Sequence, residues 1–309
     1  MQLEQELHHS GKFVNLELLA RQVVEGFISG LHKSPFHGYS SEFAEHKVYN
    51  PGESTRHIDW KLFAKTDKLF TRRYEEETNL RCHLIIDNSA SMHFPEKSRQ
   101  SLKDLNKIGF TALASACLMQ ILKKQRDSVG LSIYSDTYEY YAPEKGGDRH
   151  RRMLLHVLEE ALGRPKSKNR TSTYTYLHQI AEKLKRRSLI FFFSDMFQDE
   201  VEEEKLFEAL RHLKYNKHEL VLFHVLDKQK EFDFNYGEEP HRFTDVETGV
   251  KIDLYADNVK DSYFEEVKGY FSRLKLKCAQ YGIKYVEADI NKSFEKILLT
   301  YLVERQKFV

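Results

Sequence analysis

Two stretches of the chain decide the fold: Ile85-Ile86-Asp87-Asn88-Ser89-Ala90-Ser91-Met92 and Phe191-Phe192-Phe193-Ser194-Asp195-Met196. In each of them a continuous apolar run of strand length ends at an aspartate. Such runs predict strands that are buried on both faces, as in a parallel sheet covered by helices. Because ligands bind these sheets at the carboxyl ends of their strands, the residues after both runs are the first candidates for a functional site.

Helix-like and strand-like segments alternate on both sides of these stretches. Apolar residues at helical spacing predict helices over residues 16–31, 101–124, 148–162, 176–185, 200–213, 259–281 and 293–305. Further strands are expected over residues 69–74, 129–134, 137–141, 220–226 and 283–286, with an irregular stretch before residue 259. This alternation predicts an α/β protein with a mostly parallel sheet flanked by helices.

The distribution of turn-forming residues along the chain predicts two regions. Residues 1–80 carry scattered Gly, Pro and Ser and show no long helical pattern after the first helix. We expect them to form an N-terminal extension, a helix plus a strand-containing part, that packs on the core. Residues 81–309 are expected to form the α/β domain.

Composition and charge exclude several classes of protein. The 309 residues include 48 Lys and Arg and 47 Asp and Glu, for a net charge of +1, so a nucleic-acid partner is not expected. The longest apolar runs are far shorter than the roughly 20 residues of a membrane span. The polar start of the chain, residues 1–10, and three scattered cysteines favour a cytoplasmic protein with reduced thiols.

The oxygen-bearing side chains after the two runs predict a metal site. In a loop, Asp87, Ser89 and Ser91 can turn their oxygens toward one point, and Asp195 supplies a second carboxylate. Hard oxygen ligands of this kind suit Mg²⁺ or Mn²⁺ better than zinc. The alternative interpretation is a helix N-cap cluster in the first loop and a turn-initiating aspartate in the second.

The pattern Asp87-x-Ser89-x-Ser91 at the end of the first core strand resembles the metal-ion-dependent adhesion site of von Willebrand factor A domains. The resemblance implies a von Willebrand A-like, Rossmann-like sheet. In that family a Thr from a second loop and an Asp from a third loop complete the site. By this likeness Asp195 matches the third loop, and Ser89 and Ser91 are direct ligands.

The second loop of the resembling site is matched by Thr171. This residue stands six positions before Leu177-His178, as in the family pattern, and Thr173 is the competing choice. Asp87 and Asp195 act through water in the resembling domains.

Several further blocks are similar to the bacterial "domain of unknown function 58" family. They are residues 32–45, 49–66, 70–79 and 223–227, and the resemblance covers the chain from about residue 26 to residue 305. Members of the family are commonly found beside AAA+ ATPases of the MoxR type. The resemblance therefore implies an adaptor or chaperone-like partner of such an ATPase. It would be a non-enzymatic module that binds an Asp or Glu of another protein through its metal ion.

A metal-dependent hydrolase is the alternative function. It would use a Mg²⁺-activated water and would need a general base near the ion, for which His93 and His178 are the candidates. Neither a P-loop motif nor a dinucleotide-binding motif is found, so nucleotide binding is not expected.

The block Arg56-His57-Ile58-Asp59-Trp60 has an open role. We expect an Arg–Asp pair and a buried Trp60 to hold the N-terminal region against the core. Recognition of a partner at the surface is the alternative.

Overall fold

The structure is a computed structural model that describes residues 16–30, 45–49, 58, 60–73, 80–97, 100–101, 104–135, 138–163, 173–197, 200–237, 239–245, 249–294 and 297. The chain divides into two compact units. One comprises residues 1–32 together with residues 80–309, and the other comprises residues 33–79. The division differs from the predicted one, because the first helix groups with the α/β unit.

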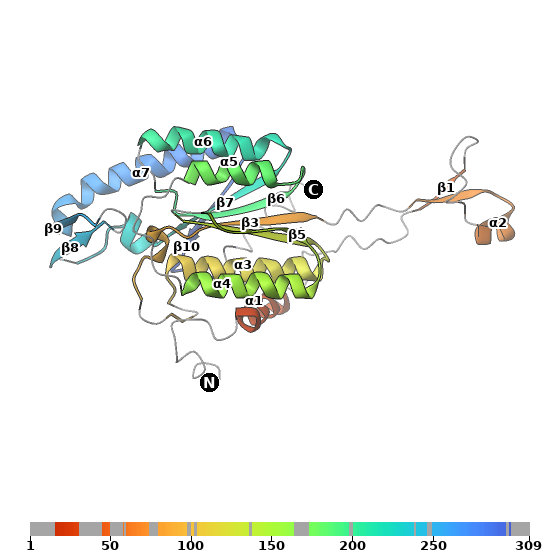
Figure 1. Ribbon diagram of the computed structural model, residues 1–309, viewed down its shortest axis with the longest axis horizontal. Coiled ribbons are helices and arrows are strands. Elements are labelled where there is room, and N and C mark those ends of the chain that lie inside the picture. Colours follow the sequence, from red (N-terminus) through yellow and green to blue (C-terminus); the bar gives the residue numbers. More distant parts are fainter. Residues whose placement is uncertain are drawn as a thin grey trace. The chain divides into compact units, whose positions relative to one another are not determined.

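A six-stranded sheet with the order β10-β7-β6-β3-β4-β5 forms the centre of the larger unit (Figure 1). Its strands are β3 (Arg81–Asp87), β4 (Ser128–Tyr134), β5 (Tyr138–Lys145), β6 (Leu189–Ser194), β7 (Glu219–Leu226) and β10 (Lys284–Asp289). All neighbours pair in parallel except β5, which runs antiparallel to β4. The predicted mostly parallel sheet is therefore confirmed.

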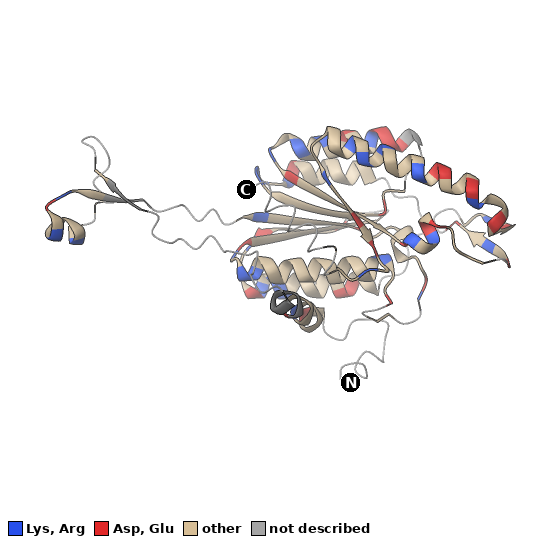
Figure 2. Ribbon diagram, turned by 180° about the vertical axis from the view of Figure 1, so that it is seen from behind, with Lys and Arg blue, Asp and Glu red and all other residues tan. Residues whose placement is uncertain are grey.

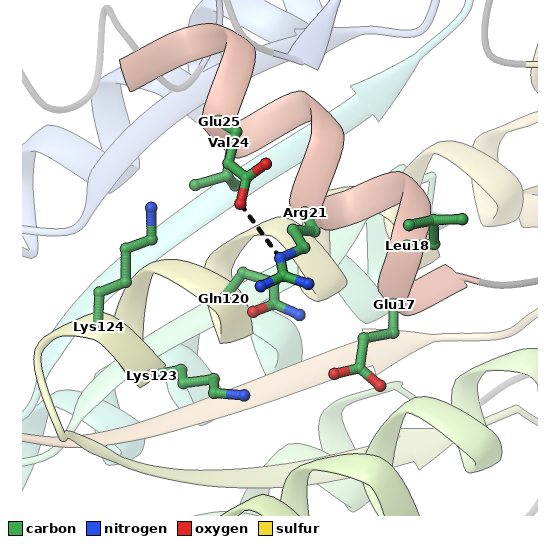
Figure 3. Close-up of a pocket in the computed structure, with 8 residues that line it drawn as sticks. All are labelled: Glu17, Leu18, Arg21, Val24, Glu25, Gln120, Lys123 and Lys124. Atoms are coloured by element: carbon green, nitrogen blue, oxygen red, sulfur yellow. Dashed lines mark hydrogen bonds and ion pairs between the residues drawn. The ribbon is translucent and has the colours of Figure 1, made fainter. Parts of the chain in front are cut away.

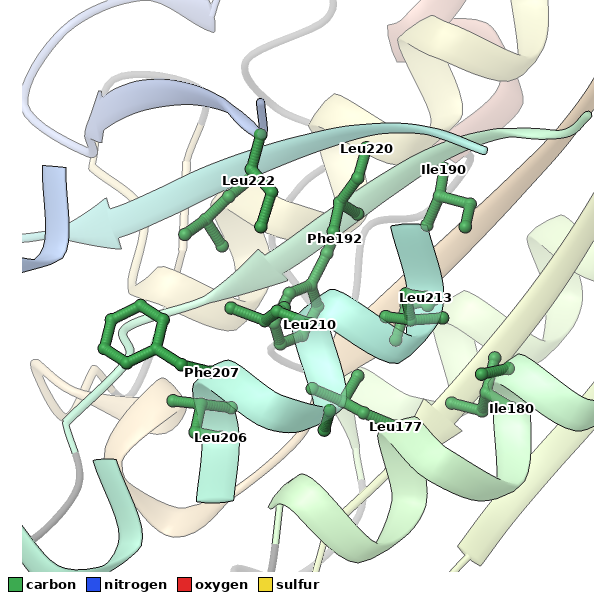
Figure 4. Packing of buried hydrophobic residues seen from close by; sticks show 14 of the residues in the cluster. Leu177, Ile180, Ile190, Phe192, Leu206, Phe207, Leu210, Leu213, Leu220 and Leu222 are labelled. Carbon is green, nitrogen blue, oxygen red and sulfur yellow. The ribbon is translucent and has the colours of Figure 1, made fainter. Parts of the chain in front are cut away.

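Helices cover both faces of this sheet (Figure 1). One face carries α5 (Thr173–Lys183), α6 (Glu200–Tyr215) and α7 (Ala256–Gln280), and the other carries α3 (Lys107–Lys124) and α4 (Asp148–Leu162). Leucine, isoleucine and phenylalanine side chains fill the space under α5 and α6 (Figure 4), among them Leu177, Ile190, Phe192, Leu210, Leu213 and Leu222. This packing fixes the strand ends that carry the candidate site.

Helix α3 is buried on all sides. Every residue from Lys107 to Met119 is buried, and α1 (Leu16–Gly30) lies over the face of α3 that points away from the sheet. The Oδ1 atom of Asn106 accepts a hydrogen bond of 2.8 Å from the Gly109 N–H and caps the helix. The helix therefore begins at Lys107, whereas the sequence predicted a start at residue 101.

A small hairpin lies in the stretch that was expected to be irregular. It consists of β8 (Pro240–Thr244) and β9 (Lys251–Tyr255), which pair antiparallel, and it follows a single π-helical turn, Lys228–Phe232. No residue of either strand is buried, and β8 lacks the apolar alternation of a half-buried strand. The predicted helix 293–305 lies almost entirely outside the described residues.

The smaller unit contains a two-stranded antiparallel sheet of β1 (Glu45–Val48) and β2 (Phe70–Arg73) and a short helix, α2 (Trp60–Thr66). The strand predicted over residues 69–74 is confirmed. Helix α2 has no buried residue, and Trp60 is 62 % exposed. The expectation of a buried Trp60 is therefore wrong, because this two-turn helix buries none of its side chains.

Basic and acidic residues are interspersed on the larger unit. Along α7, Lys and Arg alternate with Asp and Glu, as Figure 2 shows. This mixture agrees with the near-zero net charge of the chain.

Candidate metal centre

The two aspartates singled out in the sequence lie at a topological switch point. Asp87 ends β3 and Asp195 directly follows β6, and these strands are neighbours in the sheet. The chain leaves β3 toward β4 on one side and leaves β6 toward β7 on the other. Because the two connections diverge, the carboxyl ends of β3 and β6 border the crevice where ligands bind in such sheets.

The Asp87 carboxylate organises the first loop. Its Oδ1 atom accepts a hydrogen bond of 2.9 Å from the Ser89 N–H, and its Oδ2 atom accepts one of 2.8 Å from the Ser194 hydroxyl. A 3-10 turn, Ala90–His93, follows at once and brings Ser91 beside Ser89. The Oγ atoms of Ser89 and Ser91 are 3.0 Å apart. The loop therefore places the Ser89 and Ser91 hydroxyls side by side, with the Asp87 carboxylate bonded to the Ser89 backbone.

The spacing of the two hydroxyls fits a magnesium ion. Mg²⁺ binds oxygen at about 2.0–2.1 Å in octahedral geometry, so two adjacent ligands lie roughly 3 Å apart. The Ser89 and Ser91 oxygens match this spacing. The same distance also fits a simple hydrogen bond between them, so the charge around the loop has to be considered as well.

The Asp87 carboxyl lacks an adequate counter-charge. Burial, followed by the negative charge of Asp195, raises the pKa of Asp87 from 3.8 to about 6, against the opposing hydrogen bonds from Ser89 and Ser194. A nearby cation would favour the ionised carboxylate. Two buried carboxylates beside two hydroxyls are thus a donor set that a divalent cation would stabilise.

The Tyr134 hydroxyl lies at the same edge of the sheet. Tyr134 ends β4 and is fully buried, and its hydroxyl makes no hydrogen bond of good geometry with the described residues. Asp87 and Thr173 are its polar neighbours, and burial raises the pKa of Tyr134 well above its usual value. Thr173, the alternative second-loop ligand, thus begins α5 at this edge. Thr171 lies outside the described residues.

The turn after β6 holds Asp195 in a strained loop. Met196 adopts a left-handed backbone conformation with φ +57°, and its N–H donates a hydrogen bond of 3.0 Å to the Ser194 hydroxyl. The Phe197 N–H donates to Asp195 Oδ1 at 3.3 Å. Positive φ in a non-glycine residue costs energy and is common at functional sites.

A buried histidine supports the Asp195 backbone. His224 Nε2 lies 2.9 Å from the carbonyl oxygen of Asp195, and Nδ1 lies 2.6 Å from the Tyr285 hydroxyl. Because a carbonyl only accepts, we assign the proton to Nε2, so that Nδ1 accepts from Tyr285. Burial lowers the pKa of His224 to about 4, and the imidazole is neutral at pH 7.

A lysine that the sequence did not single out also reaches the site. Lys107, the first residue of α3, is fully buried. Its Nζ atom donates hydrogen bonds to Asp195 Oδ2 at 2.8 Å and to Glu231 Oε1 at 2.5 Å. The sequence placed Lys107 inside a longer helix, and no motif marks it. Lys107 and Glu231 could be found only from the folded arrangement.

Two further strands of the sheet also end at aspartates. Asp227 follows β7 and Asp289 ends β10. Their Oδ1 atoms both accept from Asn291 Nδ2, at 2.8 and 3.1 Å. Among the described residues no three or more His, Cys, Asp and Glu side chains are grouped so as to hold a metal. The candidate metal centre therefore depends on the serine hydroxyls.

The two candidate bases have other partners. His93 Nε2 lies 3.1 Å from Asn88 Oδ1, and His178 Nδ1 lies 2.9 Å from His212 Nδ1. Neither imidazole hydrogen-bonds to a candidate ligand in these contacts. Residues 56, 57 and 59 lie outside the described part of the chain.

An open pocket of about 450 Å³ lies elsewhere, between α1 and the end of α3 (Figure 3). It is lined by Glu17, Leu18, Arg21, Val24, Glu25, Gln120, Lys123 and Lys124. Lys107 and Gln120 are separated by most of the length of α3, roughly 20 Å at 1.5 Å per residue. The pocket is therefore distinct from the candidate metal centre.

The chain is thus an α/β protein with aspartates at the topological switch point of its sheet. Residues 45–269, more than half of the chain, match the family described as "Protein of unknown function DUF58". The chain belongs to this family.

Curated relatives share only part of the chain. "Uncharacterized protein Rv1480" of Mycobacterium tuberculosis and "Uncharacterized protein Mb1516" of Mycobacterium bovis are each 27% identical to it over 144 residues. The match covers 46% of this chain and 43% of each relative. The chain thus matches less than half the length of these relatives.

Solved structures resemble the chain at low sequence identity. A conserved hypothetical protein BatB from Bacteroides thetaiotaomicron has a TM-score of 0.44 and 11% identity over 74% of this chain and 100% of its own. An aerotolerance-related membrane protein from Bacteroides fragilis has a TM-score of 0.43 and 11% identity over 73% and 99%. An uncharacterized membrane spanning protein from Vibrio fischeri has a TM-score of 0.21 and 14% identity over 73% and 98%.

The predicted cytoplasmic location has to be corrected. The names of two of these structures, a membrane protein and a membrane spanning protein, contradict it, and we withdraw it. Among the described helices, none has the length and apolar character needed to cross a bilayer.

Proposed function

We propose that the chain is a metal-dependent protein-interaction module. A Mg²⁺ or Mn²⁺ ion would be held by the hydroxyls of Ser89 and Ser91, with Asp87 and Asp195 acting through water and Thr171 from the second loop. The observation that carries the proposal is the convergence of the paired serine hydroxyls with two buried carboxylates at the switch point. The resemblance to an adhesion site agrees with this ligand set.

The chemistry of these ligands favours recognition of an acidic group. Hydroxyls are neutral, and the Asp195 charge is shared with Lys107, so the ligands neutralise a divalent cation incompletely. A bound Mg²⁺ would supply an electrophilic position at which a carboxylate of a partner can replace water. The partner is therefore expected to present an Asp or Glu at the carboxyl edge of the sheet.

The partner that the family resemblance implies is a MoxR-type AAA+ ATPase. The chain would act as its adaptor or as a chaperone-like companion, without catalysing a reaction itself. The alternative, a metal-dependent hydrolase, has less support. Its two candidate bases pair with other side chains, His93 with Asn88 and His178 with His212.

Mn²⁺ binding to the full chain tests the metal site. Electron paramagnetic resonance counts free Mn²⁺, and we expect Ser89→Ala and Ser91→Ala each to weaken binding at least about tenfold by removing a direct ligand. Ser272→Ala is the matched control, because this hydroxyl is exposed and donates to the Lys268 carbonyl one helical turn away. Equal Mn²⁺ affinity of all four proteins would refute the site.

The partner claim needs its own measurement. We expect a purified MoxR-type ATPase to bind the wild-type chain in the presence of Mg²⁺ and to be released by chelator. Binding that persists in chelator, or in Ser89→Ala, would show an interface that does not use the metal.

A further inference from the structure

Lys107 forms an unusual ion cluster beside the candidate metal centre. Its ammonium group is fully buried and donates to one carboxylate from the loop after β6 and another from the π-helical turn, Asp195 and Glu231. The rings of Phe94 and Phe197 lie 5.8 and 5.6 Å from Nζ. Burial of an ammonium is costly unless hydrogen-bonded counter-charges surround it, so this arrangement fixes the lysine tightly.

Glu231 is held independently of the lysine. Its Oε2 atom accepts a hydrogen bond of 2.7 Å from the Asp227 N–H, while Oε1 accepts from Lys107. Asp195 in turn is held through Oδ1 by the Phe197 N–H and through its carbonyl by His224. Both carboxylates are therefore held in place whether Lys107 interacts more strongly with Asp195 or with Glu231.

The charges at this edge do not balance. The Asp195 carboxylate repels the carboxylates of both Asp87 and Glu231, and Lys107 is the cation bonded to Asp195 and Glu231. The ammonium bonds Asp195, the carboxylate that the proposed site also uses. A divalent cation and Lys107 would therefore draw on the same negative charge.

We propose that Lys107 is a built-in counter-cation that sets the metal affinity of this site, and that Glu231 retains the lysine when a divalent cation draws on Asp195. The inference rests on the proposed function, because it describes how the same site is regulated. The metal-free protein then has a defined state, in which Lys107 partly neutralises Asp195. When a metal ion binds and interacts with Asp195, the Lys107 ammonium interacts more strongly with Glu231. Metal binding is thereby linked to the π-helical turn, which carries Glu231.

The two substitutions that remove these charges have opposite expected effects. Lys107→Gln removes a positive charge near the cation, so Mn²⁺ should bind about tenfold more tightly or better. Glu231→Gln leaves the whole ammonium charge on Asp195, so Mn²⁺ should bind at least about threefold more weakly. A purely structural role would instead weaken binding in both variants.

A surface ion pair provides matched controls. Lys228 and Glu287 approach within 3.4 Å, and their side chains are 38% and 44% exposed. Lys228→Gln and Glu287→Gln remove the same charges from a solvated pair, and we expect Mn²⁺ affinity to change less than about twofold in each.

The experiment is Mn²⁺ titration of the full chain and its variants by electron paramagnetic resonance, with folding checked by circular dichroism. Tighter binding by Lys107→Gln and weaker binding by Glu231→Gln, each relative to wild type, supports the inference. If wild type binds but Lys107→Gln binds equally or less, the inference is wrong and the proposed function stands. If no protein binds Mn²⁺, both are wrong.

The inference can still be tested if the Lys107→Gln protein does not fold. Glu231→Gln and the charge-preserving Lys107→Arg then provide the test. Weaker binding by Glu231→Gln with near-native binding by Lys107→Arg supports the inference. Unchanged or tighter binding by Glu231→Gln overturns it.

Discussion

Asparagine at position 87 would keep the two hydrogen bonds of the native carboxyl and remove its charge. Its Oδ1 atom can accept from the Ser89 N–H, and its amide can donate to the Ser194 hydroxyl. The pKa of Asp87 is about 6 in the folded chain against 3.8 in the unfolded one. The folded state therefore loses stability as the pH rises through about 6 and the buried carboxyl ionises.

We predict that metal-free Asp87→Asn is more stable than wild type at pH 7.5 by about 1–3 kcal/mol. At pH 4 the two proteins should have similar free energies of unfolding, because the native carboxyl is then protonated. Urea unfolding at both pH values measures the difference. A variant that is less stable than wild type at pH 7.5 would show that the Asp87 charge is already compensated.

His224 gives a pH dependence of the opposite sign. Its pKa is about 4 in the folded chain and 6.5 in the unfolded one, so its contribution to stability is present above 6.5 and is lost as the pH falls toward 4. The loss is at most about 1.4 kcal/mol per pH unit in this window.

We predict that His224→Gln has a flatter dependence of unfolding free energy on pH between 6.5 and 4. Glutamine can still donate to the Asp195 carbonyl, but it does not titrate. His156→Gln is the control, since this side chain is 70% exposed and should leave the slope unchanged. Parallel curves for wild type and His224→Gln would mean that His224 does not govern the acid sensitivity.

The sequence identified those candidate site residues that belong to a recognisable pattern. Four of them stand at the ends of buried strands: Asp87, Ser89, Ser91 and Asp195. In the structure, their side chains lie at the same edge of the sheet. Lys107 could not be predicted, because a lysine in a helical segment is normally solvated. Side chains from other parts of the chain, Phe94, Asp195, Phe197 and Glu231, lie around its ammonium group in the fold.

At the scale of elements, three neighbouring strands are tied by a buried polar chain. His83 of β3 lies 2.7 Å from Ser132 of β4 and 2.7 Å from Glu144 of β5. Gly130 sits at a register shift between β4 and β5, where the strands bulge. A Cβ atom there would lie 2.5 Å from His83 Nδ1 and 2.8 Å from the Ala142 carbonyl oxygen.

We predict that Gly130→Ala destabilises the protein by about 2 kcal/mol or more, because backbone of β5 would have to move. Gly146→Ala is the control, since no atom lies within 4 Å of its Cβ position. Thermal unfolding measures both variants. A Gly130→Ala protein as stable as wild type would mean that the β4–β5 bulge yields easily.

Elements with a buried face were predicted well, and exposed ones were not. Helix α4 has the predicted bounds, β7 begins one residue before the predicted strand, and β3 and β6 end at or directly before the two aspartates singled out in the sequence. The β8–β9 hairpin and β1 were missed, because their residues alternate between partly and fully exposed or carry mixed polar side chains. Hydrophobic pattern reports burial, so elements without burial leave little signal.

For the whole molecule, the burial of apolar side chains is unequal between the two units. Among the described buried hydrophobic residues, Ile58 is the one member that falls within residues 33–79. In the described part of the chain, the apolar burial that stabilises the fold therefore lies mainly in the larger unit.

We predict that replacing residues 33–79 with a flexible Gly/Ser linker leaves a cooperative unfolding transition with a melting temperature within a few degrees of wild type. Removing residues 1–32 should instead lower stability by several kcal/mol, because Leu16, Ala20 and Val24 of α1 are buried. Calorimetry distinguishes the two variants. Loss of the cooperative transition in the linker variant would show that the larger unit needs the smaller one.

The placement of α1 over α3 has a consequence for biosynthesis. The helix is translated before α3, and the surface that it covers is made only after the whole of residues 33–79. On a ribosome this delay amounts to on the order of ten seconds. During that time the apolar side of the nascent helix faces water or a chaperone, so α1 reaches its native place only after the later-made α3 is available.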